Sequence, residues 1–297
     1  MTITQLQVLI KTVELGSFTK AAGMLNMTQP AVSHAISSIE SELGVTILIR
    51  DKRKGLIVTE VGNRILVHIR EILNGVEKIE QEVAMEKGHE VGTIRIGSFP
   101  SASAYFLPKM INIFREKYPN LELVLCEGTL KEVEDWLLSR VIDIGIVILP
   151  NKDMEIVPLT KGKMVVVLRE DHPLCKKKSI TISDLENEPI ILCKGGYEPP
   201  IIDMFKQANV PLRAEYVIST VTTALNMIQE GLGIAILAEL SLTSLPKNIQ
   251  TRELEPQVWR EIALAVPSLK DSSLAVQLFI EEFQELFAES KEVSHIS

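Results

Sequence analysis

The chain has few cysteines and no long apolar run, and both absences restrict where it works. Only three of its 297 residues are cysteines, and Cys126, Cys175 and Cys193 lie far apart in the sequence. A sparse, odd-numbered set favours reduced thiols over a disulfide framework. No segment reaches the roughly 18 apolar residues of a membrane span, and the first residues lack the pattern of a secretory signal. We therefore expect a cytoplasmic protein with no membrane partner.

Arrangements typical of catalysis or metal binding are also missing from the sequence. The five histidines show no metal-ligand spacing and have no cysteines nearby. The glycine-containing segment 231–235 precedes an apolar strand pattern instead of linking a strand to a helix, which a nucleotide-binding loop requires. We expect no enzymatic activity, no metal and no cofactor.

The charges that are present are distributed unevenly along the chain. Its net charge is −8, yet residues 1–58 carry +2 and the remainder −10. Four of the six cations in the N-terminal segment lie between Arg50 and Lys54. A local basic patch on an otherwise acidic chain indicates contact with a polyanion at that end only.

Residues 17–43 have the pattern of two short helices separated by a turn at residues 26–28. Ser17 and Thr28 are placed as N-caps, and Pro30 falls in a first turn, where its missing N–H costs nothing. Apolar residues recur at helical spacing in both segments and predict two buried stripes, formed by Phe18, Ala21, Ala22 and Leu25 and by Val32, Ile36, Ile39 and Leu43.

The opposite face of the second segment is small, neutral and rich in hydrogen-bonding groups, namely Pro30, Ser33, His34, Ser37 and Ser41. Such groups suit the base edges in the major groove of DNA. The pattern predicts a helix-turn-helix with the second segment as its recognition helix. The alternative is a helical hairpin with a polar outer face.

The flanking segments complete a winged domain over residues 1–58. An earlier helix, with Leu6, Leu9, Ile10 and Val13 on one side, supplies the third helix of the core. Two β-rich runs, 45–50 and 56–58, flank the polar turn 51–55 and predict a basic wing that contacts phosphates, although a solvated loop is the alternative. The predicted DNA contacts are Thr28, Gln29, Pro30, Ser33, His34, Ser37, Arg50, Arg53 and Lys54.

The same region resembles a known family. Residues 15–48, LGSFTKAAGMLNMTQPAVSHAISSIESELGVTIL, are similar to the N-terminal signature of LysR-type transcriptional regulators, SF..AA..L..TQPAVS..I..LE..LG..L. The similarity continues more loosely over almost the whole chain. It implies a homodimer or homotetramer that binds a double-stranded DNA operator with inverted half-sites, a small-molecule effector and RNA polymerase.

Residues 59–87 have the pattern of one long helix. An unbroken heptad seam predicts that this helix pairs with a second copy, through Ile65, Ile69, Ile72, Val76, Ile79 and Val83. The alternative is that the seam packs against the C-terminal body of its own chain. Gly62 and Gly75 weaken the helix and favour a packed pair over a rigid coil. Residues 88–92 are predicted to form a hinge.

Beyond the hinge, strand and helix patterns alternate. Strands at 93–98, 121–126 and 143–149, with helices at 105–117 and 131–139, predict a βαβαβ unit with a parallel sheet. A second alternation begins at 164–169 and includes a strand at 214–219, and the chain returns through 261–266 to a final helix at 273–288. A doubly wound enzyme domain would show similar spacing.

The resemblance implies that residues 93–297 form an effector domain of two lobes. Lobe I would comprise about 93–161 and 266–297, and lobe II about 162–265. The expected fold class is therefore an N-terminal all-α winged helix-turn-helix plus an α/β periplasmic-binding-protein-like effector domain.

In binding proteins of this plan, a ligand lies between the lobes against strand ends and helix N-termini. The predicted effector contacts are Ser98, Pro100, Ser101, Ser103, Thr129, Lys194, Gly195, Gly196, Tyr197 and Thr220. The proposed loops 98–103 and 194–197 contain no Asp or Glu, which favours a small anionic metabolite. The alternatives are that the hydroxyls are helix caps and that Lys194 is a surface lysine.

Two other functions are compatible with parts of the pattern. A thiol-based redox-sensing regulator of the same fold would need two approachable thiols, whereas Cys126 is interpreted as strand core and Cys175 and Cys193 lie on different segments. An enzyme or solute-binding module with an unrelated helical cap would show no sequence-specific DNA binding in a gel shift.

Overall fold

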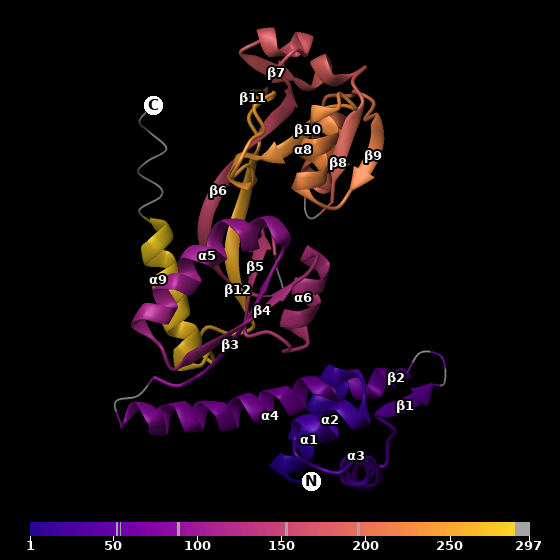
Figure 1. Cartoon of the computed structure of the whole chain (residues 1–297), viewed down its shortest axis with the longest axis vertical. Coiled ribbons are helices and arrows are strands. Elements are labelled where there is room, and N and C mark those ends of the chain that lie inside the picture. Colours follow the sequence, from indigo (N-terminus) through magenta and orange to yellow (C-terminus); the bar gives the residue numbers. More distant parts are fainter. Residues whose placement is uncertain (52, 54, 88–89, 152–153, 195–196, 289–297) are drawn as a thin grey trace. The chain divides into compact units, whose positions relative to one another are not determined.

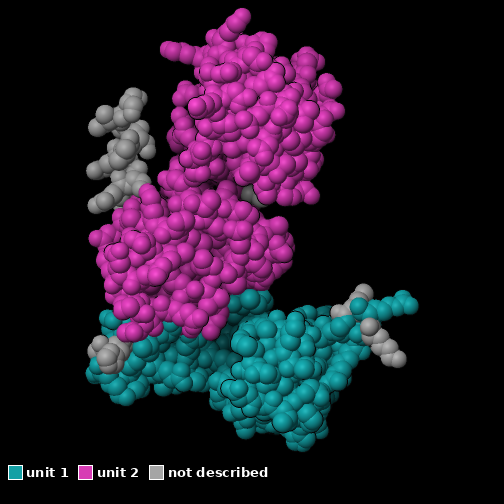
Figure 2. Space-filling view, viewed as in Figure 1, with its two compact units in different colours: residues 1–92, 138–141 teal, residues 93–137, 142–297 magenta. Residues whose placement is uncertain are grey.

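The computed structural model describes residues 1–51, 53, 55–87, 90–151, 154–194 and 197–288. Two compact units divide the chain (Figure 2): unit 1 comprises residues 1–92 with 138–141, and unit 2 comprises residues 93–137 with 142–297. Three predicted site residues, Lys54, Gly195 and Gly196, lie outside the described residues. None of the described helices is both long and apolar enough to span a membrane.

Unit 1 begins with three helices and a two-stranded hairpin, which are α1 (Ile3–Leu15), α2 (Phe18–Met24), α3 (Gln29–Leu43), β1 (Leu48–Asp51) and β2 (Gly55–Val58). The caps are those that the sequence predicts. The Ser17 side chain accepts a hydrogen bond from Lys20 N, and the Thr28 side chain accepts one from Ala31 N. β1 and β2 pair antiparallel and form the wing.

The helices of unit 1 enclose a continuous apolar core. Val32, Ile36 and Ile39 of α3 are at most 2% exposed, as their spacing predicts. Leu43 is 41% exposed, so its assignment to the buried stripe is wrong. Its position explains the difference, because it is the last residue of α3 and Gly44 then turns the chain away in a left-handed conformation (φ 67°).

The long helix α4 (Glu60–Met85) packs its first turns into the same core. Leu66 and Ile69 are 1% and 2% exposed. Gly62 allows the close approach, since a Cβ at that position would lie 2.6 Å from the carbonyl oxygen of Ile47. Gly62 is therefore a packing requirement at the start of α4 in addition to a weak helix former.

Unit 2 is built on an eight-stranded sheet with the order β4-β3-β5-β12-β6-β11-β7, to which β10 is added alongside β6. Its strands are β3 (Gly92–Ser98), β4 (Leu121–Glu127), β5 (Ile144–Ile148), β6 (Glu155–Arg169), β7 (Ser179–Thr181), β10 (Ala235–Ala238), β11 (Ile249–Glu255) and β12 (Trp259–Val266). A separate parallel pair joins β8 (Ile190–Cys193) and β9 (Ala214–Ile218). Short 3-10 turns, η1 (Pro173–Lys176), η2 (Ile182–Leu185) and η3 (Glu239–Ser241), connect strands.

Two apolar clusters divide unit 2 into lobes. The lobe I core lies on β3, β4 and β5 with α5 (Pro100–Lys117) and α9 (Leu274–Ala288), and α6 (Leu130–Leu138) follows β4. The lobe II core lies around β8 and β10 with α7 (Glu198–Gln207) and α8 (Val221–Gln229). The long strands β6 and β12 run from one lobe to the other (Figure 1). The predicted fold class is confirmed.

Aromatic rings hold α9 against α5 in lobe I. The ring centroids of Phe106 and Phe283 are 5.5 Å apart, and those of Phe114 and Phe279 are 5.3 Å apart. Such pairs add about 0.5–1.5 kcal/mol beyond the area they bury. The C-terminal helix is thereby part of lobe I, although the strands that lead to it come from lobe II.

The βαβαβ unit has the predicted parallel pairing, but β12, which lies outside that unit, makes the complete sheet mixed. β3 pairs parallel with β5, but β12 runs antiparallel to both β5 and β6. The first half of β6 was not predicted because Pro158 and Gly162 are unfavourable inside a strand. In the structure the register shifts between Ile262 and Ala263, next to Pro158, and this irregularity accommodates the proline. β7 and β11 were also not predicted.

Candidate functional site

The polar face of α3 is accessible in unit 1. Pro30, His34 and Ser37 are exposed, while Gln29 and Ser33 are half-buried. Thr28 is exposed and caps the helix. The face opposite the buried stripe therefore presents hydroxyl, imidazole and amide groups, which is the chemistry that base edges require.

The wing is joined to this face by Arg50. Its Nη2 donates a hydrogen bond to Ser33 Oγ at 3.3 Å, and its guanidinium carbon lies 3.9 Å from the ring centroid of Phe18. Arg53, near the wing tip, is exposed, and its backbone N–H donates to Asp51 Oδ1 at 2.7 Å. Arg50 is thus oriented by α2 and α3, whereas the Arg53 side chain is available to phosphates.

Glu40 is a positioning residue that the sequence reasoning missed. Its Oε1 accepts hydrogen bonds from the backbone N–H groups of Ile47, at 2.7 Å, and Leu48, at 3.0 Å. The carboxylate therefore fixes the start of the wing to the end of the recognition helix. An acidic residue shortly before a predicted strand is a weak signal, because acidic residues are equally common on solvated helix faces.

The predicted seam of α4 has two different environments. Ile69 lies in the core of unit 1, which corrects its assignment to an interface between copies, while Ile65 is half-buried and packs against that core. Ile72, Ile79 and Val83 are 43%, 66% and 50% exposed, and Val76 is half-buried. The second half of the seam is thus an exposed apolar stripe.

A cavity of about 710 Å³ lies between the two lobes of unit 2. Its lobe I wall comes from the start of α5 and the β4–α6 loop, and its lobe II wall from the ends of β8 and β9 and the start of α8. Helix starts carry unpaired N–H groups and positive potential. The predicted effector contacts in its lining are Pro100, Ser101, Thr129, Lys194, Tyr197 and Thr220.

Ser98 and Ser103 are not in the lining of this cavity. Ser98 is 1% exposed, and its hydroxyl donates to the carbonyl oxygen of Phe99 at 3.3 Å. Ser103 is half-buried one turn into α5. The structure therefore does not bring either hydroxyl to the cavity.

Two carboxylates in the lining overturn the expectation of an acid-free site. Glu127 ends β4 and Glu132 lies in the first turn of α6. Hydrogen bonds from the backbone and side chain of Thr129 lower the pKa of Glu132, so that carboxylate stays ionised. Both carboxylates flank the β4–α6 loop, which lies outside the segments 98–103 and 194–197 on which the prediction rests.

A buried cation adjoins the cavity and was also missed. Arg260 of β12 is 3% exposed, and its guanidinium carbon lies 4.9 Å from the ring centroid of Phe99 and 4.2 Å from that of Tyr197. Both rings line the cavity. Burial lowers the pKa of Arg260, but an arginine side chain stays protonated in proteins and keeps its charge. Nothing in the sequence marked Arg260 as a site residue, because it lies shortly before the apolar run 262–266 of a predicted strand.

The cysteines differ in their surroundings. Cys193 lines the cavity and is 1% exposed, and burial raises the pKa of its thiol to about 11. Burial also raises the pKa of Cys175, whose Sγ donates to the carbonyl oxygen of Arg169. Cys126 is half-buried on β4, so its interpretation as strand core is wrong.

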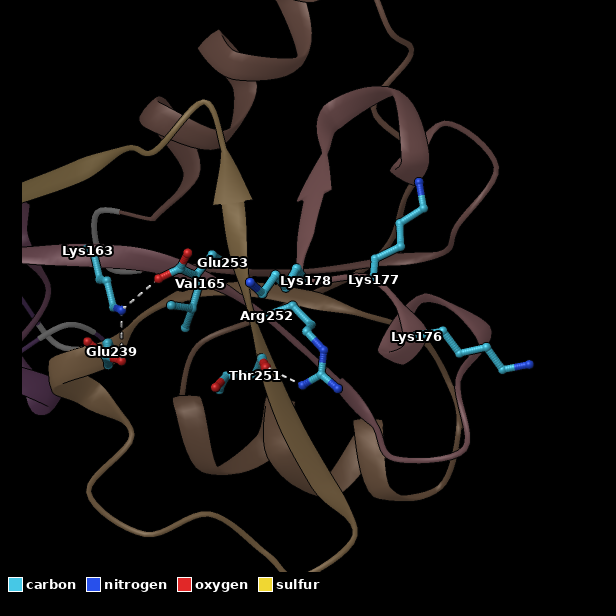
Figure 3. A pocket seen from close by; sticks show the side chains of 9 residues that line it. All are labelled: Lys163, Val165, Lys176, Lys177, Lys178, Glu239, Thr251, Arg252 and Glu253. Atoms are coloured by element: carbon cyan, nitrogen blue, oxygen red, sulfur yellow. Dashed lines mark hydrogen bonds and ion pairs between the residues drawn. The ribbon is translucent and has the colours of Figure 1, made fainter. Parts of the chain in front are cut away.

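A second hollow, of about 400 Å³, lies on lobe II (Figure 3). It is basic, and three of the five cations in its described lining are engaged by other groups of the protein. Lys163 lies 3.6 Å from Glu239 and 3.5 Å from Glu253, Lys177 pairs with Asp184, and Arg252 Nη2 donates to the carbonyl oxygen of Cys175. Lys176 extends away from the strands that form the hollow (Figure 3). The interlobe cavity is therefore the better candidate for a ligand.

Among the described residues, no group of three or more His, Cys, Asp or Glu side chains is arranged to hold a metal ion. The two features that remain are a winged helix-turn-helix and a two-lobed domain with an interlobe cavity. Together they define a DNA-binding transcriptional regulator with a ligand-binding domain.

Comparison with known proteins gives the family. The family model for bacterial regulatory helix-turn-helix proteins of the lysR family matches residues 3–63, and the model for the LysR substrate binding domain matches residues 87–288. The chain is 58% identical over 289 residues to YvbU, an HTH-type transcriptional regulator of Bacillus subtilis (strain 168), covering 97% of this chain and 99% of that one. The chain belongs to the LysR family of transcriptional regulators.

Solved structures share the fold. A full-length OxyR variant from Pseudomonas aeruginosa is 24% identical, with a TM-score of 0.78, over 96% of this chain and 95% of that one. Full-length CbnR in complex with its target DNA is 22% identical, with a TM-score of 0.64, over 96% and 99% of the two chains.

Proposed function

We propose that this LysR-type regulator binds an operator through α3 and the wing, and that a small metabolite in the interlobe cavity modulates this binding. The observation that supports the DNA contact is the accessible polar face of α3, with Ser33 held by Arg50 of the wing. The proposed contacts are those predicted from the sequence: Thr28, Gln29, Pro30, Ser33, His34, Ser37, Arg50, Arg53 and Lys54.

The proposed effector carries at least one anionic group. Ser101, Lys194 and Thr220 in the lining support this proposal, together with the helix starts of α5 and α8 and the charge of Arg260. Lobe closure on the metabolite would change the spacing of two winged domains on an inverted-repeat operator.

A homo-oligomer is part of the proposal. The exposed stripe of Ile72, Ile79 and Val83 on α4 supports pairing with a second copy, because contact with water is unfavourable for apolar side chains. We propose a dimer or a dimer of dimers that acts on DNA in the cytoplasm and contacts RNA polymerase there.

The effector proposal is tested with Ser101→Arg. An arginine at the start of α5 fills part of the cavity, so we expect the response to metabolite to disappear while operator binding is retained. Asn112→Arg, on an exposed turn of the same helix, is the matched control and should respond normally. A normal response of Ser101→Arg in a reporter assay would mean that the effector binds elsewhere.

Redox sensing is the less favoured alternative. A sensing cysteine needs a low thiol pKa, because the thiolate is the species that reacts. Burial raises the pKa of both Cys175 and Cys193. The surroundings of these two thiols therefore oppose thiolate formation.

A further inference from the structure

The charged groups in the interlobe cavity are separated into two regions. Among the described lining residues, three carry a charge: Glu127, Glu132 and Lys194. The two carboxylates flank the β4–α6 loop of lobe I, and we call Glu127, Thr129 and Glu132 the acidic corner. Lys194 follows β8 of lobe II.

The acidic corner offers acceptors to a ligand, because its donors are already engaged. Thr129 Oγ1 donates to Glu132 Oε2 at 2.8 Å, and Thr129 N donates to the same oxygen at 2.7 Å. Gly128 N donates to the carbonyl oxygen of Ser98 at 3.0 Å. A hydroxyl has a single hydrogen, so toward the cavity Thr129 presents lone pairs only.

The acidic corner also keeps its negative charge. The two hydrogen bonds from Thr129 hold the pKa of Glu132 below its ordinary range. Glu127 and Glu132 are both exposed to solvent within the open cavity. An anionic group placed against this corner would face two carboxylates, which is unfavourable.

The other side of the cavity offers donors and positive potential. Val221 and Thr222 are the first residues of α8 and line the cavity, and the first N–H groups of a helix have no intrahelical partner. Lys194 adds a cation, and Arg260 lies behind the ring of Tyr197. Phe99 and Leu225 supply apolar surface to the lining.

We infer that the effector is dipolar, with a cationic donor group held by the acidic corner and an anionic group held by Lys194 and the start of α8. A small zwitterion of the amino-acid type has this charge distribution. The inference rests on the proposal that the interlobe cavity holds the effector. Its new element is a cationic group on the effector, in addition to the anionic group already proposed. A simple anion would leave the acidic corner without a partner, and a simple amine would leave Lys194 and the start of α8 without one.

The test uses full-length protein and matched triplets of compounds, in which an amino acid, a carboxylic acid and an amine share one apolar side chain. One triplet is leucine, 4-methylpentanoate and 3-methylbutylamine, and a second is phenylalanine, 3-phenylpropanoate and 2-phenylethylamine. A wider set of amino acids, carboxylic acids and amines is screened by thermal shift, and hits are measured by calorimetry. We expect zwitterions to be the stabilising class, and the best one to bind about tenfold or more tightly than its matched acid or amine.

The double variant Glu127→Gln/Glu132→Gln tests whether the preference for zwitterions depends on the acidic corner. Glutamine keeps the side-chain acceptor that caps α6, so the fold should be retained while both charges are lost. We expect zwitterion affinity to fall about tenfold or more, while the affinity for the matched acid is unchanged or higher. Glu134→Gln, on the same helix but outside the lining, is the matched control and should bind like the parent protein.

The outcomes separate this inference from the proposed function. If carboxylic acids without an amine are the stabilising class, or if the double variant keeps the zwitterion preference, the dipolar assignment is wrong and the cavity proposal stands. If no zwitterion, acid or amine binds, the dipolar assignment and the placement of the effector in this cavity are both contradicted. Zwitterion binding that Ser101→Arg leaves unchanged would place the dipolar site outside the cavity.

Discussion

At the scale of single residues, Ser33 and His34 should read bases and Arg53 should contact phosphate. Replacing Ser33 or His34 by Ala should weaken operator binding by about 1–3 kcal/mol and relax base preference, as expected for a lost base contact. Arg53→Ala should weaken binding to all sequences and reduce the salt slope by about 0.9. Footprinting at several salt concentrations measures both effects. Unchanged operator affinity for the Ser33 and His34 variants would contradict the assignment of α3 to the major groove.

Cys193 should be an unreactive thiol in the folded protein. Its pKa is raised from 9.0 to about 11 by burial, so the folded state keeps the proton that the unfolded state loses first. Its contribution to stability is therefore present below pH 9.0 and is lost as pH rises toward about 11. We expect a thiol reagent at about pH 8, below the ordinary thiol pKa, to modify Cys193 only upon unfolding. Rapid labelling in the native state, compared with Cys193→Ser, would revive the redox alternative.

At the scale of elements, the exposed half of α4 should hold two chains together. Ile79 is 66% exposed, so Ile79→Glu should leave the fold intact and place an unpaired charge in the interface, which favours dissociation. His68→Glu, on the same helix but outside the seam, is the control and should remain oligomeric. Sedimentation measures the difference. An intact oligomer for Ile79→Glu would show that the stripe is not the interface.

The link between recognition helix and wing should depend on Glu40. Glu40→Ala removes the acceptor for two backbone N–H groups, so we expect unit 1 to lose about 1–3 kcal/mol of stability and operator binding to weaken. Glu40→Gln keeps a neutral acceptor and should lose less stability and less operator affinity than Glu40→Ala. Glu42→Ala, whose carboxylate contacts the N-terminal ammonium at the surface, should have little effect in the same denaturation experiment. Equal stability of Glu40→Ala and Glu42→Ala would contradict the positioning role.

The sequence predicted elements best where one local rule decided the structure. The caps at Ser17 and Thr28, the apolar stripe of α3 and the start of β3 follow from spacing and capping. The first half of β6 was not predicted because the strand tolerates Pro158 only through an irregularity in the pairing of β6 with β12. β12 lies far from β6 along the chain. A pairing of this kind is a tertiary effect that a local window does not contain.

At the scale of the whole molecule, the candidate cavity was predicted only in part. Ser101, Thr129 and Thr220 were found because each follows a predicted strand, where ligands of two-lobed proteins bind. Arg260 and Glu132 were missed because their relation to the cavity depends on packing between β12, Phe99 and Tyr197, and on the turn into α6. The charge of a site that several loops form can be predicted only when the positions of all of those loops are known.

Two copies of unit 1 related by two-fold symmetry are expected to read one specific DNA sequence. The most direct test is in vitro selection from a random double-stranded DNA library by the full-length protein at physiological salt. We expect enrichment of an inverted repeat whose half-sites lie about one helical turn or more apart, because two winged domains related by two-fold symmetry would bind it. Recovery of no common sequence after repeated rounds would show that the protein does not bind DNA sequence-specifically.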